Sequence, residues 1–136
     1  MADVVLGSGT TRLRFATDRS RPDAPADVLV VSVEGPGLTA SLDVHPHVVE
    51  GFLDLVDFVE GLERDFRGWP GERVYELLES DLRLAATHLG ARIWIDVVLW
   101  RFWAPEPWRC EAVVALEPGE ELRRAAVDLG ELLRPR

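Results

Sequence analysis

Alternating hydrophobic and polar residues recur along most of the chain, and this pattern predicts β-strands. In the stretch 12–17, Leu13 and Phe15 alternate with arginines, which indicates one buried face. In the stretch 92–102, the alternate positions from Ile93 to Leu99 are all aliphatic. Strands are predicted at 4–6, 12–17, 28–34, 38–44, 73–78, 82–88, 92–102 and 108–117.

Two segments instead repeat their apolar residues at spacings of three and four, which is typical of amphipathic helices. The first runs over about 46–66, with Pro46 in its first turn and the glycines of 68–71 after its end. The second runs over about 119–134, with Glu120 and Glu121 in its first turn. Acidic residues there interact favourably with the helix dipole.

The order of these elements predicts the fold class. Consecutive strands lie too close in sequence for helical crossovers, so the strands should pair antiparallel. We therefore expect an α+β fold, in which one antiparallel β-sheet of about six or seven strands carries both helices on one face. A chain of 136 residues suits a single domain, spanning 1–136.

The charge of the chain is concentrated in one segment. The formal net charge is −9, and the stretch 45–81 holds ten acids against three arginines. Such a field repels phosphate, so neither nucleic acid nor an anionic membrane is expected as a partner, whereas a basic protein is. The alternative is that these acids only keep the protein soluble. The candidate partner-binding acids are Glu50, Asp54 and Asp57, spaced to share one helix face, with Glu72, Glu76 and Glu79.

Aromatic residues cluster near the last two strands. Trp94, Trp100, Phe102, Trp103 and Trp108 lie within fifteen residues. Trp94 and Trp100 fall on the strand face opposite the aliphatic residues, so they point outward if the aliphatic face meets the helices. Outward tryptophans are enriched at interfaces, which makes Trp100 and Trp103 candidate partner-binding residues. A sheet buried on both sides is the alternative.

Catalytic and metal-binding patterns are weak. The chain has no lysine and one cysteine, Cys110, and no serine lies in a nucleophile elbow. The pair His45 and His47 lacks further ligands at useful spacing, and His88 shares a strand face with leucines. We expect no enzyme activity, no metal and no cofactor. The single cysteine and the absence of a signal peptide favour a cytoplasmic protein.

Short motifs in the middle of the chain resemble a known family. They are Gly68-Trp69-Pro70-Gly71-Glu72, then Leu78-Glu79 and Asp81-Leu82, then Ala86-Thr87-His88. The pattern resembles that of the bacterial domain-of-unknown-function family 6228, which is similar to WapI-like immunity proteins. The chain departs from it at Leu77 and Ser80, where the family has serine and glycine, and after His88, where a second family histidine is missing.

This resemblance implies a non-catalytic protein-binding module of the immunity type, which binds and neutralises a cognate toxin. The acidic charge of the chain favours a toxin that is basic. Two alternatives remain open. One is a self-associating accessory domain that forms a homodimer through the aromatic sheet face, and the other is a small-ligand binder. The motif glycines, Trp69 and Leu82 can also be explained by turns and core packing alone.

Overall fold

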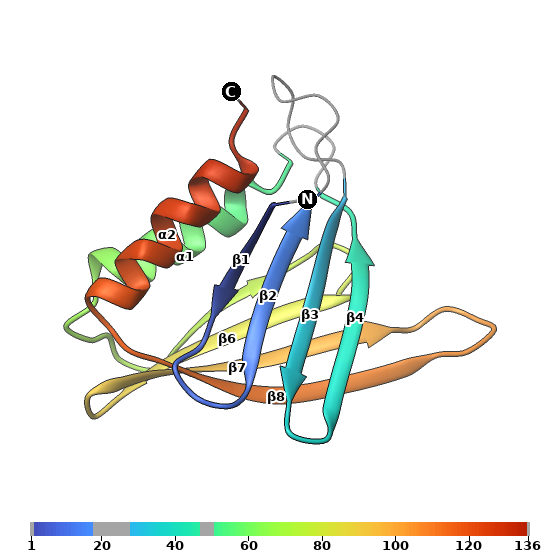
Figure 1. Ribbon diagram of the computed structural model, residues 1–136, viewed down its shortest axis with the longest axis horizontal. Helices are drawn as coiled ribbons and strands as arrows, with labels where there is room; N and C mark the ends of the chain where they lie inside the picture. Colours follow the sequence, from blue (N-terminus) through green and yellow to red (C-terminus); the bar gives the residue numbers. More distant parts are fainter. Residues whose placement is uncertain (1, 18–27, 47–50, 136) are drawn as a thin grey trace.

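The computed structural model describes residues 2–17, 28–46 and 51–135, and it contains eight strands and two helices in this part of the chain (Figure 1). The elements are β1 (Ala2–Leu6), β2 (Arg12–Thr17), β3 (Leu29–Gly35), β4 (Leu38–Val44), α1 (Leu53–Arg64), β5 (Glu72–Glu76), β6 (Leu82–Leu89), β7 (Arg92–Arg101), β8 (Trp108–Leu116) and α2 (Glu120–Leu133). The α+β class and the antiparallel pairing are confirmed.

The strands form two sheets, so the prediction of a single sheet of six or seven strands is wrong. One sheet has the order β1-β2-β3-β4 and the other the order β5-β6-β7-β8, and every pairing joins consecutive strands. The helix α1 separates the two meanders in sequence. Alternation along a strand reveals which face is buried, but it does not reveal which strands are neighbours, and so it could not divide the strands between two sheets.

The sheets pack face to face, and the helices extend one of the two layers. In Figure 1 the β1–β4 sheet crosses in front of the β5–β8 sheet, and both helices lie beside β1. The helix α2 packs against β1 and α1, and β4 lies against β7. Inward side chains of both sheets are fully buried, including Phe15, Val31, Leu84 and Val97, and they belong to one core cluster.

The first helix begins later than predicted. The sequence pattern places its start near residue 46, but α1 begins at Leu53 with Phe52 as its N-cap residue. Gly51 has a φ of 62°, a left-handed conformation that a continuous helix does not contain. Residues 47–50 lie outside the described part of the chain. The second helix begins and ends within one residue of the predicted bounds.

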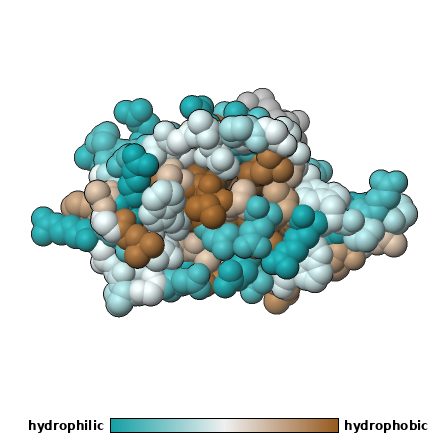
Figure 2. All heavy atoms as spheres, turned by 90° about the horizontal axis from the view of Figure 1, so that it is seen from below, coloured by the Kyte–Doolittle hydropathy of each residue, from teal (hydrophilic) through white to brown (hydrophobic). Residues whose placement is uncertain are grey.

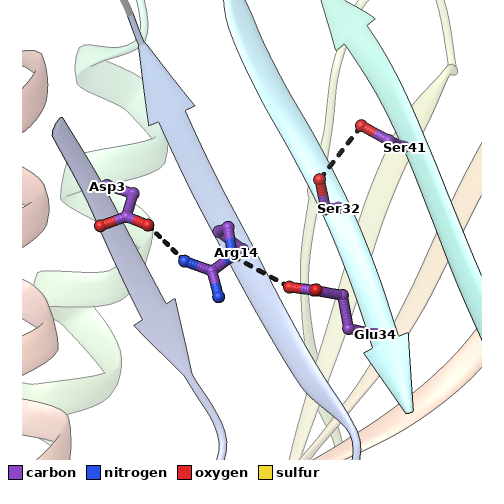
Figure 3. A network of polar contacts seen from close by, with 5 residues as sticks. All are labelled: Asp3, Arg14, Ser32, Glu34 and Ser41. Atoms are coloured by element: carbon purple, nitrogen blue, oxygen red, sulfur yellow. Dashed lines mark hydrogen bonds and ion pairs between the residues drawn. The ribbon is translucent and has the colours of Figure 1, made fainter. Parts of the chain in front are cut away.

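The outer faces of the two sheets differ in polarity. On the β1–β4 sheet, Arg14 lies between Asp3 and Glu34 and donates to both, and the distance from Arg14 Nε to Glu34 Oε1 is 2.9 Å (Figure 3). Ser32 donates to Ser41 across the next pair of strands. Exposed ion pairs of this kind stabilise little, but they suit a solvated surface.

The outer face of the β5–β8 sheet is apolar by comparison. Large hydrophobic side chains there are exposed by 37–54%, namely Val74, Trp94, Trp100 and Val113. Asp96 lies among them, paired with Ala85 and Val113 on the neighbouring strands. Its buried Oδ1 has no hydrogen-bond partner among the described residues. Of the two outer faces, this one therefore has more to gain from covering by a partner.

Candidate functional site: an aromatic hairpin tip beside an acidic turn

The motif residues around Trp69 and His88 form a clamp between the end of α1 and strand β6. Trp69 is 7% exposed, and its Nε1 donates to the carbonyl of Ala86 at 3.2 Å. The His88 ring packs edge-on to Trp69, with centroids 5.4 Å apart, and His88 Nε2 lies 3.0 Å from the carbonyl oxygen of Phe66. A Cβ atom on Gly68 would lie 3.6 Å from the same ring. These contacts give the clamp (Gly68, Trp69, Ala86 and His88) a structural role.

Strand β5 is attached to α1 by two polar side chains on its inner face. The Arg73 guanidinium lies 4.9 Å from the Trp69 ring centroid and donates to Asp65 Oδ2 at 2.7 Å. The Tyr75 hydroxyl lies 3.3 Å from Asp54 Oδ1, and burial followed by the Asp54 charge raises the pKa of Tyr75. Asp54 therefore helps to attach β5 to α1 and is not only a solvent-exposed carboxylate.

The hairpin that joins β7 to β8 carries an exposed aromatic cluster. Figure 1 shows this hairpin projecting beyond β4, away from the helices. Trp100, Phe102 and Trp103 are exposed by 42%, 41% and 38%, and their successive ring centroids are 5.4 and 5.3 Å apart. We call these three residues the aromatic tip.

Arg101 fixes the conformation of the aromatic tip. Its guanidinium lies 5.1 Å from the Trp103 ring centroid, a cation–π geometry. Its Nη1 donates to the main-chain carbonyls of Trp103 and Glu106, at 3.1 and 2.6 Å. The rings therefore stand on a hairpin that is braced before any partner arrives, which lowers the entropy lost on binding.

A tight turn between β5 and β6 lies next to the aromatic tip. The N–H of Ser80 donates to Leu77 at 2.8 Å, and Ser80 adopts a positive φ of 61°. The N–H of Trp100 donates to the carbonyl of Asp81 at 2.9 Å, which places the turn beside the base of the aromatic tip. Leu78 is 81% exposed and Glu79 is exposed too. We call residues 77–81 the acidic turn.

Asp81 is the buried carboxylate of the acidic turn. The residue is 5% exposed, and its Oδ1 has no hydrogen-bond partner in the described part of the chain. Burial raises the pKa of Asp81, and the charge of Glu79 adds to this effect, while His45 opposes it. The folded protein thus holds a carboxylate whose ionised form it stabilises less well than water does.

Asp81→Asn is expected to stabilise the protein at neutral pH. Because the folded-state pKa is raised, the folded state binds more protons than the unfolded state between the ordinary value of 3.8 and the raised one, and stability falls as pH rises through that window. Removing the charge should raise the free energy of unfolding at pH 7 by on the order of 1 kcal/mol, because a neutral amide costs less to bury than a carboxylate. Urea unfolding at pH 7 and at pH 3 measures this, and a gain that persists unchanged below the ordinary pKa would contradict it.

The structure gathers only some of the predicted partner-binding residues. Glu76 and Glu79 lie at the same end of the β5–β8 sheet as Trp100 and Trp103. Glu72 is exposed at the other end of β5, where it pairs with Thr87. Asp57 is exposed on α1, Asp54 bonds to Tyr75, and Glu50 lies outside the described residues. Of the predicted row of Glu50, Asp54 and Asp57, the described residues thus contain one exposed acid, Asp57, and one that bonds to Tyr75, Asp54.

Two contributors to the site were missed from the sequence. The sequence predicts a strand up to Leu78, whereas the structure ends β5 at Glu76, and the pair Leu77-Leu78, which breaks the alternation, is the signal for this earlier end. Arg101 was not singled out, because its contacts depend on the path of the hairpin.

The other side chains considered as catalytic candidates, His88 and Cys110, make contacts that stabilise the fold. His88 belongs to the clamp, and Cys110 is partly buried on β8, where burial raises the pKa of its thiol. Across the described ranges, no group of three or more potential ligands could hold a metal ion. His47, one of the two histidines considered as ligands, lies outside these ranges. No helix in the described chain is long and apolar enough to cross a bilayer.

Comparison with models of known protein families shows to which family the chain belongs. The model of a family described as a family of unknown function, DUF6228, matches residues 4–136. The chain belongs to this family. No curated protein and no solved structure gives a significant match. The match covers both sheets and both helices, so the DUF6228 region includes the clamp, the acidic turn and the aromatic tip.

Proposed function

We propose that this DUF6228 protein is a non-catalytic binding module of the immunity type, which binds a basic toxin through its aromatic tip. The observation that carries the proposal is the exposed and braced cluster of Trp100, Phe102 and Trp103. Tryptophan and arginine dominate the binding energy of protein interfaces, and here Arg101 supports the rings. The choice of a toxin as the partner rests on the resemblance to WapI-like immunity proteins.

The charges beside the aromatic tip favour a basic partner. Glu76 and Glu79 are exposed on the same end of the sheet, and Leu78 adds an apolar side chain between them. Acids at the rim of an interface mainly increase the association rate with a positively charged protein, while the buried aromatic anchors determine how slowly it leaves. Glu76 and Glu79 would thus affect mainly the association rate, and the aromatic tip mainly the dissociation rate.

The test is a binding titration with the protein encoded by the neighbouring gene. Trp100→Ala/Trp103→Ala is expected to weaken the complex by roughly a hundredfold or more, since each hot-spot truncation costs about 2 kcal/mol or more. Trp94→Ala is the matched control, because Trp94 is 37% exposed on the same strand and sheet face but at the opposite end of β7. Equal losses in both variants, or none in either, would contradict the assignment of the site.

A second arm of the same titration examines the acids. Glu76→Arg/Glu79→Arg should lower the association rate and weaken its dependence on salt. Asp128→Arg/Glu131→Arg, a pair of exposed acids on α2, is the control with the same change in charge. Asp54 is not a suitable test position, because it bonds to Tyr75 and its removal would also disturb the fold.

A further inference from the structure

The two sheets have four edge strands in the described part of the chain, β1, β4, β5 and β8. The helix α2 packs against β1, and β4 has seven residues and faces β7 of the other sheet across the shared core. Strand β5 has five residues and is bordered by α1 through the contacts of Arg73 and Tyr75. Strand β8 has nine residues, and it pairs with β7 on one side only. Long unprotected edges are templates for pairing with another chain.

The hydrogen bonds already present show which groups of β8 point outward. Trp100 donates its N–H to the carbonyl of Asp81 in the acidic turn, on the side of β7 that faces β6, so Trp100 and its partner Arg109 form a pair without mutual hydrogen bonds. At the other end of β8, the carbonyl of Ala115 accepts from the N–H of Ser8, which also places it on the outer edge. The main-chain groups of Arg109, Glu111 and Val113 therefore point away from β7. Ser8 already occupies the far end, and among the described residues no strand pairs with the outer edge of the first half of β8.

We propose that two copies of this chain pair antiparallel through the first half of β8, about a two-fold axis at Cys110. In this register Arg109 lies opposite Glu111 of the second copy, and the same pair repeats across the axis. Each of the two pairs exchanges two N–H···O bonds, and each also places opposite charges side by side on the outer face. The two β5–β8 sheets become one continuous sheet.

The charges of the facing side chains and the hydrogen bond already made by Ala115 favour this register over the adjacent ones. An axis at Glu111 would place two Glu111 carboxylates directly opposite each other, which is destabilising. An axis at Ala112 would extend the overlap to Ala115, whose carbonyl Ser8 already binds. Within one chain Arg109 Nη2 lies 3.7 Å from Glu111 Oε2, and the two side chains are 59% and 55% exposed, so both can exchange partners across the axis.

The surface around this edge is suited to burial. Strand β8 runs along the lower edge of the molecule in Figure 1, and the view from below shows apolar side chains gathered in the middle of that side, with hydrophilic ones around them (Figure 2). Val113 is 54% exposed, and Cys110 and Ala112 are only partly buried. This dimer goes beyond the proposed function, and it uses the strand edge, whereas toxin binding uses the aromatic tip.

Charge reversal tests the dimer through its mass in solution. Sedimentation or light scattering of the full chain should give twice the 15.2 kDa chain mass. Arg109→Glu and Glu111→Arg each place like charges opposite each other and should give monomers, and the double swap Arg109→Glu/Glu111→Arg should restore the dimer. Arg124→Glu, an exposed change on α2, is the control. Circular dichroism should show the same fold for all of them, because both positions are exposed on an edge strand.

Disulfide crosslinking through Cys110 tests the register of the two strands independently of the mass measurement. Directly opposed residues in such a pair have Cα atoms about 4.5 Å apart, within the range that a disulfide spans. Mild oxidation with diamide should therefore link two wild-type chains through Cys110, and Cys110→Ser should abolish the link. A wild-type monomer at all accessible concentrations would overturn the proposal. So would a dimer that survives both single reversals, or one that forms without linking through Cys110.

Discussion

Trp69→Ala is expected to lower the free energy of unfolding by about 3–5 kcal/mol, the usual cost of truncating a buried tryptophan. The substitution removes the ring that packs against His88 and under Arg73, and it leaves the carbonyl of Ala86 without its donor. The loss is a large fraction of the stability of an ordinary domain. Urea unfolding followed by far-ultraviolet circular dichroism measures it.

Two further variants identify the source of this loss of stability. Trp69→Phe retains most of the ring packing but loses the hydrogen bond to Ala86. The lost bond should lower the free energy of unfolding by about 1 kcal/mol, and the lost packing should lower it by less. Trp94→Ala removes a tryptophan that is 37% exposed and should change stability much less. If Trp69→Ala left stability unchanged but abolished partner binding, the clamp would be a binding site and the structural role assigned to it would be wrong.

Phe15→Ala should cost a similar amount, about 3–5 kcal/mol, although Phe15 lies in the other sheet. Phe15 is fully buried on β2, between Val4 of β1 and Val31 of β3. Its side chain belongs to the single core cluster that both sheets share. The cavity left by its ring should therefore destabilise the whole molecule.

The positions of the tryptophans allow a direct test of that coupling. All five lie between residues 69 and 108, so tryptophan fluorescence reports only on the second sheet and its surroundings. In a two-state protein the transitions from fluorescence and from circular dichroism coincide, and Phe15→Ala shifts both equally. A fluorescence transition that stays at the wild-type urea concentration would show that the two sheets unfold separately.

The strands could be predicted from the sequence because each one has a buried and an exposed side. The stretch Ile93–Leu99 has an aliphatic residue at every second position, and the structure gives β7 close to the predicted bounds. The start of α1 could not be predicted in the same way. Apolar residues before Leu53 continue the helical spacing, but Gly51 takes a left-handed conformation that the spacing does not reveal.

The candidate site was predicted in part for the same reason. Alternation places Trp100 on the outer face, and the structure places it there. Its proximity to Glu79 depends on the hydrogen bond between Trp100 and Asp81, which joins strands that pair only in the folded sheet. The engagement of Asp54 by Tyr75 is also a tertiary contact, and no local pattern around either residue indicates it.

The meander order of both sheets affects how the chain folds as it is synthesised. Strands β1–β4 come from residues 2–44 and pair only with their neighbours in sequence, so this sheet can form as soon as it leaves the ribosome. Its inner face, however, shares one buried core with residues of β6–β8 and α2, which emerge later. The nascent sheet therefore exposes Phe15, Val31 and their neighbours to water until residues up to about 133 have been made. Docking of the two halves is the long-range step, and local strand pairing precedes it.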